Sequence, residues 1–581
     1  MKDATFSSAR LLSLYDRISD APDAIPRLRR FVLDLAVRGK LVDQDAADEP
    51  AADLLKRIAK EKARLRTSGE KRKETELKQF STVDAPFPLP HGWIWVRLGD
   101  LGETNIGLTY SPSDVSNSGT PVLRSSNVQN GKLDFKDLVR VKCSPKESAM
   151  VQDGDLLICA RNGSRALVGK VALIENLSER SAFGAFMAIF RSEVNKYLYL
   201  FISSPLFRQV IDEVNTTTIN QITQNNLRST LAPIPPLAEQ HRIVAKVNEL
   251  MALCDQLEQA RAGREAVRDR LTTASLARLT APDTDAGTFQ SHARFALQSL
   301  STLTTRPDQI KTLRQTILNL AVHGKLLAQD GTDEPVADTL DRISAERNEL
   351  VRQKAIRREQ PLAVIAPKEL PYDLPEGWQW VRIGNLALFT QYGSSEKSNP
   401  TEKGVPVLAM GNIQEGRVIW GNDKKIPAKS DELPDLFLKK FDLLYNRTNS
   451  AELVGKTGVY LGEDDCRTFA SYLIRIRPSL RSSSPYYLNL AMNAPIFRET
   501  QIVPLIKQQT GQANVNGTAL KNMLIPLPPL GEQHRIVARV DALMALCDQL
   551  EASLTTIATT RRTLLDALLH EVLGGQTEAA A

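Results

Sequence analysis

The sequence of 581 residues lacks the features that mark several common classes of protein. It has only five cysteines and no C-x-x-C pair, which argues against a disulfide framework and against a zinc site. No apolar run approaches the roughly 20 residues that cross a bilayer. The opening MKDATFSSARLL also lacks the apolar stretch of a signal peptide. We therefore expect a cytoplasmic protein that holds no metal.

Catalytic motifs are also missing. We find no dinucleotide-binding fingerprint, no nucleophile elbow, no histidine cluster and no Asn-Pro-Pro-aromatic segment of the kind that adenine methyltransferases use. Gly455, Lys456 and Thr457 resemble the end of a phosphate-binding loop, but Ser450 stands where the first glycine of that loop belongs. A tight turn between strands explains this segment better. The sequence thus predicts no catalytic residue, and a chain that does no covalent chemistry by itself.

Length and composition set wider limits. A chain of 581 residues exceeds what one hydrophobic core supports, so several domains are expected. Its content of 42% hydrophobic and 24% charged residues is ordinary for a globular protein. The net charge of +6 and the pI of about 8.9 permit a polyanionic partner but do not require one.

One segment occurs twice. Residues 234–258 read IPPLAEQHRIVAKVNELMALCDQLE, and residues 527–551 read LPPLGEQHRIVARVDALMALCDQLE. Apolar residues alternate at steps of four and three, as on a coiled-coil seam: Ile243, Val247, Leu250, Cys254 and Leu257, and then Ile536, Val540, Leu543, Cys547 and Leu550. A single helix of this kind is more often ordinary core, but two near-identical copies indicate a shared role. The Glu-Gln-His at each start is typical of a helix cap.

A second repeat precedes each globular region. Residues 25–42 and 310–327 share LAVxGKL, and each carries a helix that is closed by a glycine suited to a left-handed cap, Gly39 or Gly324. A further helix follows the Asp-Glu-Pro of each copy. After a proline-rich hinge, strand-like patterns begin at Trp93 and Trp378 and run through each globular region.

Polar runs close both globular regions, at residues 215–226 and 507–518. Amide and hydroxyl side chains at this density suit hydrogen bonds to base edges and phosphates. The alternative is a flexible polar loop without a ligand. Both interpretations stay open from the residues alone.

Taken together, these duplicated segments resemble the specificity subunit of type I restriction-modification systems. The resemblance rests on a globular domain that closes in PPLxEQ, a long heptad helix after it, and the LAVxGKL segment, all present twice. It implies two target recognition domains that each read one half of a bipartite, asymmetric double-stranded DNA target. It also implies docking of two modification subunits, which methylate adenine with S-adenosylmethionine, and of restriction subunits, which use ATP and magnesium. None of these cofactors is expected on this chain.

The resemblance implies an α+β fold. Two globular α/β target recognition domains would be separated by long helices that form an antiparallel coiled coil, with an internal pseudo-twofold repeat. The expected division is an N-terminal helical region, recognition domain 1, a central helical region, recognition domain 2, and a C-terminal helix with its tail, at residues 1–83, 84–235, 236–371, 372–528 and 529–581.

Candidate DNA-binding residues are polar side chains at corresponding places in the two domains. Arginine pairs with guanine, and asparagine or glutamine with adenine, which is why these types are chosen. In domain 1 they are Tyr110, Arg124, Asn127, Arg161, Asn162, Asn220, Gln221, Gln224 and Asn225. In domain 2 they are Tyr392, Ser394, Asn412, Asn446, Arg447, Asn449, Gln509, Gln512 and Asn514.

Two other functions compete with this hypothesis. The chain could be a fragment or stand-alone form of a fused restriction-methylation enzyme, which would need a catalytic motif that the sequence does not contain. It could also be a protein-assembly scaffold without DNA affinity. A steep loss of DNA binding with added salt would count against the scaffold, because phosphate contacts release counterions.

Overall fold

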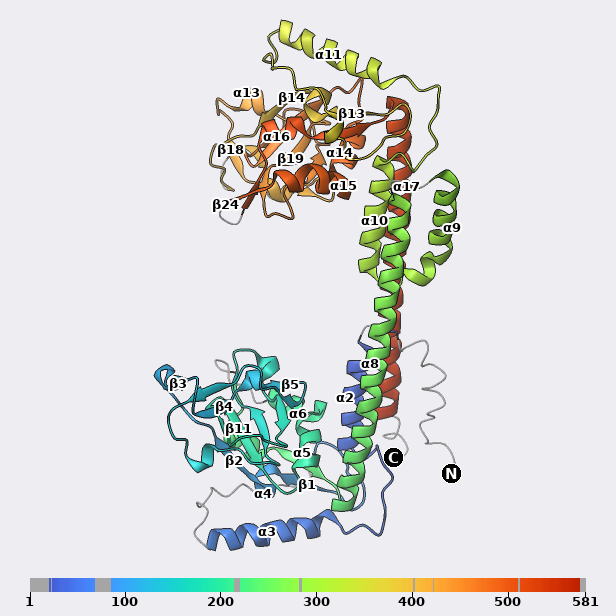
Figure 1. Cartoon of the computed structure of the whole chain (residues 1–581). Helices are drawn as coiled ribbons and strands as arrows, with labels where there is room; N and C mark the ends of the chain where they lie inside the picture. The colour runs from blue at the N-terminus through green and yellow to red at the C-terminus, as the bar shows by residue number, and fades with distance from the viewer. Residues whose placement is uncertain are drawn as a thin grey trace. The chain divides into compact units, whose positions relative to one another are not determined.

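The computed structural model describes residues 20–21, 23–67, 85–213, 220–281, 285–400, 403–421, 423–509 and 512–574. Residues 215–219 of the first polar run and residues 510–511 of the second lie outside this set. The chain forms two compact units: residues 1–263 with 558–581, and residues 264–557. Each unit contains one globular domain and parts of the long helices (Figure 1).

The first unit contains the following elements: α2 (Ala24–Val37), α3 (Ala51–Thr67), β1 (Ile94–Arg97), α4 (Leu98–Leu101), β2 (Glu103–Ile106), β3 (Val115–Ser116), β4 (Thr120–Leu123), β5 (Val128–Gln129), β6 (Lys132–Leu133), β7 (Val139–Val141), β8 (Leu156–Cys159), β9 (Val171–Leu173), β10 (Ala182–Phe183), β11 (Met187–Arg191), α5 (Asn195–Ile202), α6 (Pro205–Glu213), α7 (Gln224–Ser229), β12 (Leu231–Ile234) and the start of α8 (Leu237–Thr280).

The second unit follows much of this order, but helix α13 and strands β20, β24 and β25 have no counterpart among the elements given above. Its elements are α9 (Ala286–Leu303), α10 (Pro307–Val322), α11 (Val336–Arg352), β13 (Gln379–Arg382), α12 (Ile383–Leu386), β14 (Ala387–Tyr392), β15 (Gly404–Leu408), β16 (Ile413–Gln414), β17 (Arg417–Val418), β18 (Lys425–Pro427), α13 (Leu433–Leu436), β19 (Leu443–Asn446), β20 (Thr448–Asn449), β21 (Thr457–Val459), β22 (Thr468–Phe469), β23 (Leu473–Pro478), α14 (Pro485–Asn493), α15 (Pro495–Phe497), β24 (Lys507–Gln509), β25 (Gln512–Asn514), α16 (Gly517–Asn522), β26 (Leu524–Leu527) and most of α17 (Leu530–Gly574).

Corresponding sheets build the two globular domains. In the first, β2, β11, β8 and β9 form an antiparallel sheet, and β10, β4, β7 and β3 form another in which β4 and β10 are parallel. In the second, the order β14-β23-β19-β21 matches the first sheet, and β18-β15-β22 matches the second. Antiparallel pairs β1–β12 and β13–β26 bring the entry and exit of each domain together. The α+β class and the internal repeat expected from the sequence are confirmed.

A buried polar junction fixes each domain to its long helix. The indole Nε1 of Trp93 donates to the Glu239 carboxylate over 3.0 Å, and Trp378 donates to Glu532 over 3.0 Å. The next side chain, Gln240 or Gln533, donates to the carbonyl oxygen of the first residue of the Pro-Pro pair. Glu239 is only 1% exposed. The Glu-Gln pair therefore holds the first strand and the proline turn, and the predicted place of the glutamate in the first helical turn is confirmed.

The predicted glycine caps are confirmed at Gly39 and Gly324, whose φ angles are +67° and +65°. These angles favour glycine. A Cβ atom at either position would also come within 2.4 Å of a proline ring, Pro90 or Pro375. Each glycine therefore allows the domain's proline hinge to lie against the end of α2 or α10.

The register of ion pairs along α2 gives the directions of the long helices in the first unit. Arg29 contacts Asp255 and Glu258 of α8, whereas Val32 and Val37 share a core cluster with Ile243 and Val247 nearer the start of α8. These contacts make α2 and α8 antiparallel. On α17, Arg562 contacts Asp23 and Asp566 contacts Arg27, which makes α2 and α17 parallel. The helices α8 and α17 are thus antiparallel, as predicted.

The second unit has the same arrangement around α10. Arg314 contacts Asp548 and Glu551 of α17 over 2.5 and 2.8 Å, the equivalents of the residues that Arg29 contacts. Leu320 of α10 packs with Leu276 and Leu279 near the end of α8. Each short helix is therefore clamped between one long helix that runs against it and one that runs with it.

The seam residues are not equally buried. Ile243, Val247 and Cys254 are at most 6% exposed, and so are their counterparts Ile536, Val540 and Cys547. Leu250, Leu543 and Leu550 are half-buried, whereas Leu257 is 37% exposed. The seam thus begins as part of the core that joins helix to domain and becomes more open along α8.

The buried Glu239 and Glu532 predict a pH effect on stability. Burial raises the pKa of both carboxyls above the ordinary 4.5. The folded chain therefore binds these protons more tightly than the unfolded chain. The contribution of the two carboxyls to folding stability is fully present below pH 4.5 and is lost as pH rises through their pKa in the folded chain. Glu239→Gln removes the titration. Its Tm relative to the original chain is expected to rise as pH increases above 4.5, and Glu239→Gln with Glu532→Gln is expected to increase the effect.

Thermal melts between about pH 4.5 and 8 measure this difference, with the exposed Glu249→Gln as the control. A Tm difference that stays constant over this pH range would contradict the assignment.

Candidate nucleic-acid interface

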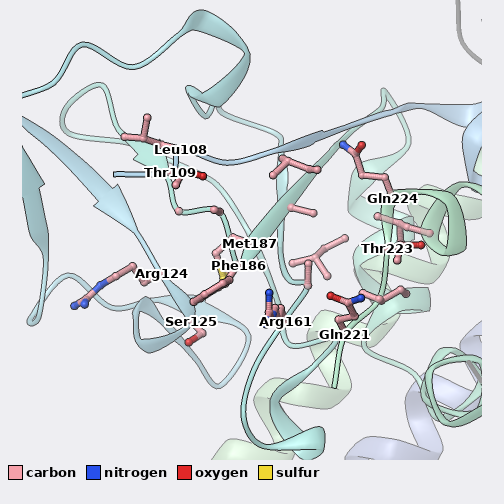
Figure 2. A pocket seen from close by; sticks show the side chains of 18 of the residues that line it. Leu108, Thr109, Arg124, Ser125, Arg161, Phe186, Met187, Gln221, Thr223 and Gln224 are labelled. Atoms are coloured by element: carbon pink, nitrogen blue, oxygen red, sulfur yellow. The ribbon is translucent and has the colours of Figure 1, made fainter. Parts of the chain in front are cut away.

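The first domain has an open cleft of about 1170 Å³. It lies between the ends of β2, β8 and β11, the turn that follows β4, and the segment from residue 221 into α7 (Figure 2). Six of the nine residues predicted to bind DNA in this domain line the cleft: Tyr110, Arg124, Arg161, Gln221, Gln224 and Asn225. Segments far apart in the sequence thus bring most of the predicted polar set to one place.

Arg161 lies at the centre of this cleft. Its backbone N–H donates to the Phe186 carbonyl over 3.0 Å, and a β-bridge links it to Gln221. Its guanidinium carbon lies 5.2 Å from the centre of the exposed Phe186 ring, a cation–π contact. Within the described residues, no side chain forms an ion pair or hydrogen bond with this guanidinium. The donors of Arg161 therefore remain available to a ligand.

Other polar groups of the cleft are already partly engaged. Arg124 forms an ion pair with Asp137 over 3.1 Å, and Gln224 donates to the Thr104 carbonyl over 3.1 Å. Figure 2 shows Arg124 at one side of the cleft and Gln224 at the other. These residues can rearrange toward a ligand only if they exchange existing contacts.

Three predicted residues of domain 1 lie outside the cleft lining. Asn127 is 1% exposed, and its amide holds a turn by accepting from the Arg124 N–H and donating to two carbonyls. A buried, satisfied amide cannot reach a base edge, so its assignment to DNA contact is withdrawn. Asn162 donates to the Ser125 hydroxyl, and Asn220 donates to the Gly163 carbonyl.

The second domain repeats the central arginine. The guanidinium carbon of Arg447 lies 5.0 Å from the centre of the Tyr392 ring, and its Nη1 donates to the Ser471 carbonyl over 3.2 Å. Tyr392 is 44% exposed, and Asn514 on β25 is exposed as well. Asn449 pairs through its backbone with Ala513. These residues lie where β19, β14 and β25 approach one another.

The other five residues predicted in domain 2 are buried, form a turn or have side chains outside the described residues. Ser394 and Asn446 are 3% and 1% exposed, so burial removes them from the set of DNA-contact candidates. Asn412 accepts from the Ala409 N–H and donates to the Ile419 carbonyl, which is the turn role of Asn127. Gln509 and Gln512 lie on β24 and β25, and their side chains lie outside the described set.

Several exposed apolar residues at these sites were not predicted. Ile106 and Phe186 are 59% and 60% exposed, and Tyr472 is 45% exposed. A search for polar side chains passes over such residues. The one local signal is a glycine directly after Ile106 and after Tyr392. The described part of the chain contains no group of three histidine, cysteine or acidic side chains placed to hold a metal ion.

Asn127→Ala tests its structural role. Because three hydrogen bonds between this buried amide and backbone groups of the turn would be lost, the variant is expected to lose about 1 to 3 kcal/mol of unfolding free energy. Urea denaturation measures this loss. The exposed Asn225→Ala is the control and is expected to leave stability unchanged. An Asn127→Ala variant with normal stability but impaired DNA binding would return this residue to the interface.

Comparison with known proteins defines the class of this two-domain chain. A family model described as "Type I restriction modification DNA specificity domain" matches residues 90–263 and 375–557, once in each repeat. The chain belongs to the family of type I restriction-modification specificity subunits. Membership confirms the predicted family and the non-catalytic role expected of such a subunit.

Individual relatives match over nearly their whole length. The specificity subunit of the type I restriction enzyme EcoAI from Escherichia coli is 31% identical over 94% of this chain and 93% of its own. That of EcoEI, also from Escherichia coli, is 30% identical over 94% of both chains. A solved structure titled "Structural basis underlying complex assembly and conformational transition of the type I R-M system" has a TM-score of 0.50 at 19% identity, covering 84% of this chain and 99% of that chain, and shows a shared fold.

Proposed function

We propose that this chain is the DNA-reading subunit of a type I restriction-modification complex, acting in the cytoplasm. Its two domains read the two halves of an asymmetric, bipartite duplex target. The observation that carries this proposal is the repeated arginine, Arg161 and Arg447, at equivalent places in two domains of one frame. Among the described residues, the donors of Arg161 are free in its cleft, and Arg447 keeps donors beyond the one that binds the Ser471 carbonyl. Such a guanidinium suits bidentate recognition of guanine.

Unequal domains on a repeated frame support a split target. The frame residues match closely, for example Trp93 with Trp378 and Glu239 with Glu532. The cleft residues differ, since Ile106 corresponds to Tyr392 and Arg124 to Ala409. Two domains held alike but lined differently are expected to bind two unlike half-sites.

The long helices support docking of two copies of one partner. Leu253 on α8 and its counterpart Leu546 on α17 are 46% and 58% exposed. Leu257, one turn after Leu253, extends the first patch. An exposed leucine at the same place of both repeated helices gives two matched docking patches, which suit two identical subunits. We assign these patches to the modification subunits, which bind S-adenosylmethionine. The restriction subunits, with their ATP and magnesium, join the same complex.

Arg161→Ala and Arg447→Ala test the reading role. The modification subunit is expressed with each variant in cells, and methyladenine is mapped across the genome. Loss of a bidentate arginine–guanine pair removes about 1 to 3 kcal/mol of discrimination. Arg161→Ala is therefore expected to relax or abolish recognition of one half-site, and Arg447→Ala of the other.

Arg180→Ala is a matched control, because Arg180 is exposed, is paired with Glu147 and does not line the cleft. Equal damage to both half-sites by one variant would indicate a folding role instead. If no methylated motif depends on this chain while the modification subunit is expressed, the proposed function fails.

Leu253→Asp and Leu546→Asp test the docking patches. A charge on an apolar contact disfavours association, so each single variant is expected to bind one modification subunit where the original chain binds two, and the double variant none. Native mass spectrometry of the reconstituted complex counts the subunits. Gln256→Asp and Gln549→Asp, also exposed and on the same helices, are the controls. Two bound subunits in the double variant would place docking elsewhere.

A further inference from the structure

The backbone identifies equivalent positions in the two domains despite their different sequences. A Cβ atom at Gly107 would lie 2.3 Å from the Phe183 carbonyl oxygen, and one at Gly393 would lie 2.3 Å from that of Phe469. Only glycine tolerates so close an approach. The residue after each glycine forms a parallel β-bridge, Leu108 with Gly184 and Ser394 with Ala470. Ile106 and Tyr392, which precede these glycines, therefore occupy the same place.

A second pair of positions matches in the same way. The Arg161 N–H donates to the Phe186 carbonyl over 3.0 Å, and the Arg447 N–H donates to the Tyr472 carbonyl over 3.0 Å. Phe186 and Tyr472 are thus equivalent, and so are the two arginines. Each domain carries a reading cluster of one arginine and two flanking apolar or aromatic residues: Arg161 with Ile106 and Phe186, and Arg447 with Tyr392 and Tyr472.

The flanking residues are exposed in both clusters. In domain 1, Ile106 is 59% and Phe186 60% exposed, and in domain 2, Tyr392 is 44% and Tyr472 45% exposed. One exposed apolar side chain needs no explanation. Four large ones, at matching positions beside matching arginines, are not explained by packing within the domain. Each arginine also rests on one flanking ring, Arg161 on Phe186 and Arg447 on Tyr392.

The chemistry of the flanking residues differs between domains. Ile106 and Phe186 have no polar side-chain atom. Both tyrosines have a hydroxyl, and that of Tyr392 accepts from the Gly517 N–H over 2.5 Å. If these clusters meet DNA, domain 1 offers apolar surface where domain 2 offers a hydrogen-bonding group.

Apolar side chains have two known uses against DNA. One is a wedge that enters a base step from the minor groove and unstacks it. The other is contact with the 5-methyl group of thymine, the apolar feature of base edges in the major groove. Ile106 and Phe186 line an open cleft together with Arg161, and Figure 2 shows Phe186 and Arg161 among its lining residues. They therefore form a recessed surface. A recessed surface does not wedge into a base step, which favours the methyl contact.

We propose that Ile106 and Phe186 recognise a thymine through its 5-methyl group, next to the base pair that Arg161 contacts, and that the first half-site therefore requires this thymine. Tyr392 and Tyr472 replace this apolar contact in the second domain, so the second half-site has no such requirement at the equivalent place. The inference rests on the proposed DNA-reading function and adds the base feature that one domain reads.

Deoxyuridine lacks only the 5-methyl group of thymidine and tests this contact directly. After the target is mapped by its methylation, each thymine of each half-site is replaced in turn by uracil in a duplex. Binding is measured on the complex of this chain with its modification subunits, without S-adenosylmethionine. Burial of one methyl group strengthens binding by about three- to tenfold. One replacement in the first half-site is therefore expected to weaken binding by the same factor.

Variants then connect the effect to the residues. Ile106→Ala and Phe186→Ala remove the apolar partner, so each is expected to weaken binding to the thymine duplex and to reduce the uracil effect to less than about twofold, because the contact is already gone. Tyr392→Ala and Tyr472→Ala are the matched variants, and they are expected to leave the uracil effect in the first half-site intact. Both side chains of the first cluster are exposed, so normal folding is expected and is checked by Tm.

Two results would overturn the inference: uracil tolerated at every thymine position of the first half-site, or a uracil effect that persists undiminished in Ile106→Ala and Phe186→Ala. These results differ from failure of the proposed function. If the original complex binds mapped and scrambled duplexes equally, the reading function itself is wrong. If it prefers the mapped target but tolerates uracil throughout, only the methyl contact is wrong.

Discussion

The hydrogen bond between a buried carboxylate and an indole fixes the frame of this protein. Glu239 on the first turn of α8 accepts from Trp93 at the start of the first domain, and Glu532 accepts from Trp378. A buried carboxylate without a partner is costly, so helix and domain are coupled at this point. Tyr197 and Tyr487 add a matching hydrogen bond to the carbonyl of Pro233 or Pro526 on the closing strand. Both ends of each domain are thereby held near the start of one long helix.

Because the buried junctions hold each domain to its helix, the exposed reading clusters can change without a change in the fold. The junction residues are buried and their partners are specific, so changes there disturb folding. The residues of the reading clusters are exposed, and substitutions at exposed positions usually change stability by less than about 0.5 kcal/mol. Ile106 can therefore correspond to Tyr392, and Phe186 to Tyr472, without strain on the sheets that carry them. A repeated frame can present two different surfaces to DNA.

The sequence predicted the frame because its signals are local and occur twice. Apolar spacing marked the long helices, and Gly39 with Gly324 marked the helix ends. The role of Glu239 was missed, since its partner Trp93 is distant in the chain and no local pattern reports that contact. Helix α9 was also missed, because residues 286–303 lie outside both repeated segments. The division into five segments stays a prediction.

The candidate interface was harder to predict because residue type does not determine role. Asparagine serves both as a base reader and as a turn former. Asn127 and Asn412 form equivalent turns, whereas Asn225 lies exposed in the cleft. Arg161 and Arg447 were predicted because their guanidinium groups can donate to bases. The aromatic rings that they contact, Phe186 and Tyr392, lie on segments remote in sequence, so only the fold identifies these contacts. Selection by polarity could not find Ile106 or Phe186, since their significance lies in the position they share with two tyrosines. Position in a repeated fold, more than polarity, thus identifies the exposed side chains that we propose to face the DNA.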